Sequence, residues 1–103
     1  MTIKTKPFDP ATYLDSPAAI AAYLEEAFAI GEPAFIADAL GVVARAHGMT
    51  EVARESGLGR ESLYKALSPD GHPELATVVK VMRTLGLRLS TTVLPEQKSP
   101  ARK

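Results

Sequence analysis

The chain has 103 residues, of which 12 are basic and 12 acidic, and it has no cysteine. Its length fits one small domain, and a hydrophobic fraction of 46% is enough for a folded core. The lack of cysteine excludes disulfides and thiolate metal sites, and the lack of a long apolar run excludes a membrane-spanning helix, so we expect a cytoplasmic protein.

The zero net charge hides an uneven distribution along the chain. Residues 1–48 carry three basic and six acidic side chains, a net charge of −3. Residues 49–103 carry nine basic and six acidic side chains, a net charge of +3. Such an asymmetry is typical of a protein with two surfaces for two kinds of partner, although ordinary scatter of surface charge explains a difference of this size equally well.

Proline and glycine divide the first half of the chain into two predicted helices. The first is expected over Pro17–Ile30, and the second between Pro33 and Gly48. Gly41 lies inside the second helix, where glycine costs about 1 kcal/mol relative to alanine, which suggests a close helix crossing. The side chains expected in the core are Ile20, Leu24, Ala27 and Phe28 on the first helix, and Phe35, Ile36, Ala39, Leu40, Val43 and Ala46 on the second.

Three shorter helices are expected in the second half. Thr50 can cap a helix over Glu51–Ser56, and a further helix runs over Arg60–Leu67. A Ser-Pro-Asp-Gly turn then leads to a fifth helix, Pro73–Leu85. Its apolar face is Leu75, Val78, Val79, Met82 and Leu85.

After the fifth helix, residues that face the two sides of the chain alternate one by one, which is the two-residue period of a β-strand. This alternation predicts one strand, Leu87–Leu94, ahead of a basic tail, residues 95–103, that we expect to be disordered. A lone strand needs a partner, which can be Thr2–Lys6 of the same chain, the same strand of a second copy, or the sheet edge of another protein. We favour the second copy, which gives a homodimer. The strand residues facing one side are Leu87, Leu89, Thr91 and Val93.

The third and fourth helices have the spacing of a helix-turn-helix, with Thr50–Ser56 first and Arg60–Leu67 as the recognition helix. Ala53 is small enough for the helix contact, and Gly57 permits the tight turn. We expect base-reading residues at Arg60, Glu61, Tyr64 and Lys65, and DNA phosphate contacts from Thr50, Ser62 and Ser68. A two-helix packing unit with a solvated face is the alternative interpretation.

Several segments together give the chain a family resemblance. They are Phe8-Asp9, Tyr13–Asp15, Ile20–Ala27, Ile36–Gly41, Ala44–Met49, Gly57-Leu58, Arg60–Ser68 and Leu85–Ser90, of which Arg60–Ser68 is the most specific. In these the chain resembles the addiction-module antidote proteins, an Xre/HigA-like branch of antitoxins. The resemblance implies a mainly α fold: a five-helix lambda-repressor-like helix-turn-helix domain over residues 1–94 with one C-terminal β-strand.

The same resemblance implies the antitoxin of a type II toxin–antitoxin module. Such a protein binds and neutralises a RelE/HigB-like toxin that cleaves mRNA, and represses its own operon by sequence-specific binding to operator DNA. It is not an enzyme and needs no cofactor. The chain departs from the family pattern at Gly59, where serine is usual, and at His72, where asparagine is frequent. Gly59 lacks the serine hydroxyl that could contact a DNA phosphate, and His72 is a weaker cap than asparagine for the fifth helix.

A toxin that handles RNA is expected to be basic. Its binding surface is therefore predicted in the acidic first half of the chain, around residues 12–28. The residues proposed for it are Tyr13, Tyr23, Glu25 and Glu26. Two other hypotheses are a stand-alone Xre-type repressor without a toxin and an interaction module that no longer binds DNA. No metal site is expected, because the two histidines, His47 and His72, lie 25 residues apart without cysteine.

Overall fold

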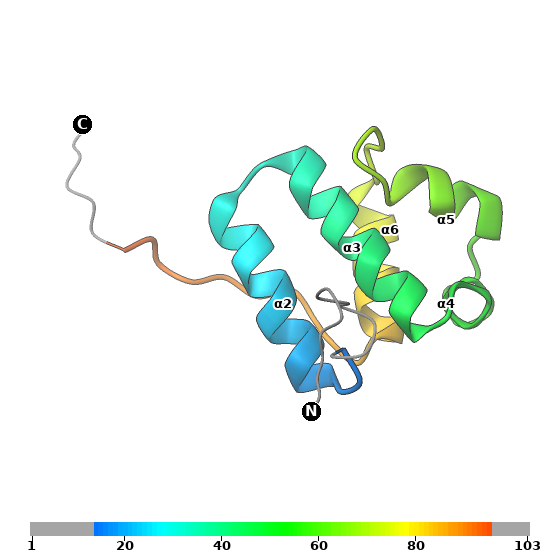
Figure 1. The fold of residues 1–103 in the computed structure, drawn as a ribbon, viewed down its shortest axis with the longest axis horizontal. Coiled ribbons are helices and arrows are strands. Elements are labelled where there is room, and N and C mark those ends of the chain that lie inside the picture. Colours follow the sequence, from blue (N-terminus) through cyan, green and yellow to red (C-terminus); the bar gives the residue numbers. More distant parts are fainter. Residues whose placement is uncertain (1–13, 96–103) are drawn as a thin grey trace, which may run out of the picture.

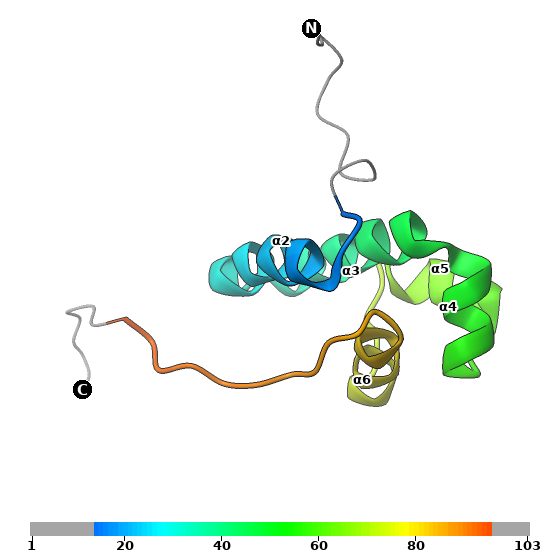
Figure 2. The same ribbon diagram turned by 90° about the horizontal axis from the view of Figure 1, so that it is seen from below.

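The computed structural model describes residues 14–95, and all regular structure in this range is helical (Figure 1). The helices are α2 (Pro17–Ile30), α3 (Pro33–His47), α4 (Met49–Ser56), α5 (Arg60–Ala66) and α6 (Leu75–Thr84). The prediction of a mainly α fold with five helices is therefore confirmed for residues 14–95. α2 packs on α3, α3 on α4, and α4 on both α5 and α6. Figure 2 shows α2 and α3 in one layer, with α6 beneath it.

The ends of α2 lie where the sequence predicts them. The Ser16 hydroxyl accepts a hydrogen bond from the Ala19 backbone N–H at 3.2 Å, and Pro17 occupies the first turn, where a backbone N–H has no helical partner. Gly31 closes the helix with φ 77° and ψ 11°, a left-handed conformation that glycine adopts without strain. The local chemistry of the chain is thus enough to set the length of this helix.

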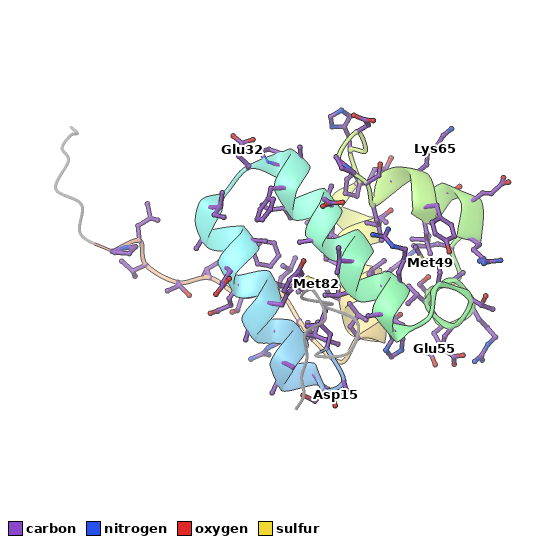
Figure 3. The ribbon with its side chains drawn as sticks, in the orientation of Figure 1. Asp15, Glu32, Met49, Glu55, Lys65 and Met82 are labelled. Atoms are coloured by element: carbon purple, nitrogen blue, oxygen red, sulfur yellow. The ribbon has the colours of Figure 1, made fainter. Side chains whose placement is uncertain are left out.

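One hydrophobic core joins all five helices. Its fully buried side chains are Leu24 from α2, Leu40 and Val43 from α3, Val52 from α4, Leu63 and Leu67 from α5 and its C-cap, and Val81 from α6. The sulfur-bearing side chains of Met49 and Met82 also lie inside (Figure 3). Three apolar residues expected in the core are instead exposed: Phe35, Leu75 and Val79. The first two lie in the first turn of their helices, where the helix has not yet reached its neighbours.

Gly41 lies at a close contact between α3 and the residue that ends α5, as its position inside a helix predicts. It is buried, and a Cβ atom placed on it would lie 2.1 Å from the backbone oxygen of Leu67. Backbone atoms cannot move aside as a side chain can, so only glycine lets α3 approach the end of α5 this closely. This contact fixes where α5 sits on the rest of the protein.

Two helix starts differ from the sequence prediction. α4 begins at Met49, so Thr50 lies inside its first turn and does not cap it. Met49 is buried in the core, and this packing favours a helix that includes it. α6 begins at Leu75, two residues later than Pro73, with Glu74 in the N-cap position.

The predicted β-strand is not found. Residues 87–95 form no strand in the described part of the chain and run as irregular, extended backbone along the underside of α2 (Figure 2). The Leu87 N–H donates to the Met82 oxygen at 2.8 Å, which ties the segment to the end of α6. A strand exists only when a second one pairs with it, and residues 14–95 offer none. Thr2–Lys6, one of the three expected partners, lies outside the described residues, as do Tyr13 and residues 96–103.

Candidate nucleic-acid interface

α4 and α5 are joined by a three-residue turn whose shape comes from local interactions. Gly57 adopts φ 76° and ψ 14°, and its N–H donates to the Ala53 oxygen at 2.9 Å. The Ser56 hydroxyl donates to the same oxygen at 3.4 Å and accepts from the Leu58 N–H at 3.3 Å. Sequence reasoning found the glycine but missed Ser56, whose signal is a hydroxyl directly before a left-handed glycine.

The inner side of this helix pair is anchored in the core. Val52 of α4 and Leu63 and Leu67 of the α5 region are at most 1% exposed. Ala53 and Leu58 pack against them as partly buried neighbours. Because every apolar anchor of α5 points inward, its polar side chains are left on the outer side.

The four residues predicted to read bases all lie on that outer side. Arg60, Glu61, Tyr64 and Lys65 are exposed, and Figure 3 shows Lys65 directed away from the helical body. The guanidinium carbon of Arg60 lies 5.6 Å from the centre of the Tyr64 ring, within the range of a cation–π interaction. This contact orients Arg60, which precedes Tyr64 by one helical turn. The N–H groups at the edge of the guanidinium remain available to a ligand. No ion pair involves these residues within residues 14–95.

The three predicted phosphate-contacting residues have different environments. Thr50 and Ser62 are exposed at the starts of α4 and α5. The Ser68 hydroxyl instead donates to the Lys65 backbone oxygen at 2.9 Å, so it helps to end α5 and only its acceptor sites remain. Gly59 stands at the N-cap of α5 with extended backbone and without a side-chain hydrogen bond.

One ion pair lies on the outer face of α4. The Arg54 guanidinium donates to the Glu51 carboxylate, and both side chains are largely exposed. The hydrogen bond and the charge of Arg54 lower the pKa of Glu51. The pair neutralises one of the basic residues next to α5, so Arg54 contributes less positive potential to this face than its charge alone implies.

The residues predicted to contact a toxin lie on α2. Glu25 and Glu26 are exposed and make no ion pair within the described residues. Tyr23 is partly buried against the core, and burial together with the nearby Asp38 carboxylate raises its pKa, while Arg45 opposes this shift. Tyr23 therefore serves mainly in packing α2 on α3.

Residues 14–95 contain neither a cluster of metal-binding side chains nor a membrane-spanning helix. No three His, Asp or Glu side chains in this range come close enough to hold a metal ion. No described helix combines the length and the apolar character needed to cross a bilayer.

The fold and the site define a small helical domain that presents one short polar helix, α5, on an apolar anchor. Residues 4–93 match the family model described as "probable addiction module antidote protein". The chain belongs to this family. It is also 47% identical over 88 residues to an uncharacterized protein of Haemophilus influenzae (strain ATCC 51907 / DSM 11121 / KW20 / Rd), covering 85% of this chain and 91% of that protein. No solved structure matches the chain.

Family membership confirms the resemblance to addiction-module antidotes and indicates an antitoxin role with a toxin partner.

Proposed function

We propose that the chain is the antitoxin of a type II toxin–antitoxin module, located in the cytoplasm, and that it has no catalytic activity of its own. In this proposal it binds and neutralises a RelE/HigB-like, mRNA-cleaving toxin and represses its own operon. Membership of the antidote family supports the first role. The observation that carries the second is the outer side of α5, where Arg60, Tyr64 and Lys65 are exposed on an anchored helix.

The arrangement of α4 and α5 as two short helices joined by a three-residue turn supports the proposal of a lambda-repressor-like helix-turn-helix. A recognition helix enters the major groove with its N-terminal residues facing base edges, and Arg60 and Glu61 are the first two residues of α5. Arginine and lysine pair with guanine, and a glutamate accepts from the cytosine amine. Tyr64, held beside Arg60, can contact a thymine methyl group or a sugar. Thr50 and Ser62, with the acceptor side of Ser68, would set the register on the phosphates.

A homodimer fits this mode of binding, because two copies of α5 can occupy half-sites about 34 Å apart. The extended segment over residues 88–94 has no backbone hydrogen bond within the described range. Pairing of this segment with its copy would satisfy these groups and create the strand that a single chain lacks. Leu87, Leu89, Thr91 and Val93 would then share one side of a two-stranded ribbon.

A gel shift with the promoter of the chain's own operon tests the DNA-binding role. Arg60→Ala and Lys65→Ala should each weaken binding by about 1–3 kcal/mol, because each removes a base contact. Arg83→Ala is the matched control: it removes an exposed positive charge from α6 and should change the affinity far less.

Equal losses in all three variants would mean that only the overall charge matters and would refute a reading role for α5. Co-purification with the toxin encoded beside the chain tests the other half of the proposal. A chain that binds its promoter but no toxin would instead be a stand-alone Xre-type repressor.

A further inference from the structure

A groove of about 650 Å³ runs between α2 and the extended residues 87–95. Its α2 wall is formed by small and apolar side chains, Ala21, Phe28 and Ala29, and the end of α6 contributes Met82. The opposite wall is the segment itself, from Leu87 onward. The segment therefore runs beside α2 without closing against it, and a hollow of mainly apolar character is left between them.

In the single chain, the segment that forms this wall exposes apolar side chains to solvent and leaves backbone N–H and C=O groups without hydrogen bonds to other described residues. Val93 and Leu94 are 90% and 82% exposed, although both are apolar and both border the groove. The backbone of residues 88–94 makes no hydrogen bond within the described range. A groove with apolar side chains on both walls is suited to an inserted polypeptide segment. An extended backbone has two hydrogen-bonding edges, so pairing with a second copy along one edge, as proposed above, leaves the other edge for such a segment.

The charge around the groove limits what this segment can be. No lysine or arginine occurs between Lys6 and Arg45, while five acidic residues lie between positions 14 and 44. None of these five makes an ion pair in the described part of the chain. Glu25 lies on the α2 wall of the groove and Arg88 on the opposite wall, so the acidic side of the groove is its α2 side. Figure 3 shows Asp15 and Glu32 near the two ends of α2, on the far side of the protein from Lys65.

We infer that this groove is the docking site for a basic, amphipathic segment of the toxin. The inference rests on the proposed antitoxin function. An apolar side chain of the toxin would enter between Phe28 and Leu87, and a neighbouring lysine or arginine would meet Glu25. The net −5 charge of residues 14–44 would repel nucleic acid. A second copy offers basic side chains mainly from α4–α6, the part of the chain that includes the proposed recognition helix α5.

Paired substitutions on α2 test the site with a control on the same helix. The groove variant is Glu25→Lys with Ala29→Trp, one turn apart and both on the groove wall. The control is Glu26→Lys with Ala22→Trp, also exposed and one turn apart but outside the groove. Glu26 is also among the residues predicted from the sequence to contact the toxin, so this control separates contact inside the groove from contact with the remaining acidic face of α2. Both variants change the net charge and the side-chain volume equally. Long-range electrostatic attraction is therefore matched, and only the local contact differs.

The affinity of each full-length variant is measured with the purified toxin encoded beside the chain. The groove variant should bind the toxin at least about tenfold more weakly than the control, and both should shift the promoter DNA as wild type does. Equal affinities of the two variants would overturn the inference while the antitoxin function stands. A wild-type chain that binds no toxin would overturn the proposed function itself.

Two further measurements keep the result decisive. Light scattering on each variant without toxin reports self-association, and a change confined to the groove variant would assign the groove to a second copy. Hydrogen exchange on the wild-type complex needs no substitution at all. Toxin binding should slow exchange of the amides of residues 88–94, and unchanged exchange there would also overturn the inference.

Discussion

The two halves of this protein carry different surfaces on one shared core. Residues 14–44, which form α2 and most of α3, have five acidic and no basic side chains. Residues 45–95, which include α4, α5 and α6, have seven basic and five acidic side chains. The two regions therefore have net charges of −5 and +2, and residues 1–13 and 96–103 supply the remaining +3 that brings the whole chain to zero. Composition alone argues against DNA binding, whereas the spatial separation of charge permits it.

The two surfaces are held together at the contact between Gly41 of α3 and Leu67 at the end of α5. Gly41→Ala should cause the largest loss of stability, about 3 kcal/mol, because the new methyl group would meet a backbone oxygen at 2.1 Å. Urea denaturation measures this loss. Since the clash lies between the halves, DNA binding and toxin binding should fall together.

Gly59→Ala is the control for this substitution. A Cβ atom at Gly59 meets only the Ser62 side chain, at 3.6 Å, an ordinary contact distance. The cost should stay below about 1 kcal/mol, the usual range for an apolar N-cap. If both variants have the same urea midpoint, the close crossing of α3 and α5 is wrong.

Gly57→Ala should have a smaller effect that is confined to one half. The site has open space, with no atom within 4 Å of the place where a methyl group would lie, so the penalty comes only from φ of 76°. An L-residue in this left-handed region costs about 1–2 kcal/mol. Gly57→Asn should lose less, because asparagine tolerates this conformation. The urea midpoint measures both, and an alanine variant as stable as wild type would contradict the turn.

Much of the fold could be predicted because the residues that start and end its helices are close to those helices in the sequence. Ser16 and Pro17 start α2, and Gly31 and Gly57 end helices in left-handed conformations, so these boundaries follow from neighbouring residues. The predicted crossing at Gly41 was also correct, since a buried glycine inside a helix has few other uses.

The features that sequence reasoning missed depend on distant parts of the chain. The start of α4 moves to include Met49 because that side chain finds a place in the core. Phe35 has the helical spacing of a core residue but lies beyond the reach of the neighbouring helices, at 46% exposure. Residues 87–94 have strand-like alternation, yet strand formation needs a partner that the pattern cannot supply. The outer side of α5 follows from the periodicity, whereas the groove beside α2 does not.

The smallest predicted effect concerns an acidic residue within the basic half. Glu51 has a partner in Arg54, unlike Glu25 across the protein, and this hydrogen bond and charge lower its pKa. A carboxyl group whose pKa is lower in the folded state contributes stability above its unfolded pKa, and this contribution is lost as the pH falls through the folded value. The melting temperature of the Glu51→Gln variant should therefore change less between pH 7 and about pH 3 than the melting temperature of wild type does. Because both side chains are exposed, the difference should be small at low salt and smaller still in 1 M salt. Glu26→Gln removes an exposed, unpaired carboxylate and serves as the control, and an identical change in both variants would show that the Glu51–Arg54 pair has no separate role in the basic half.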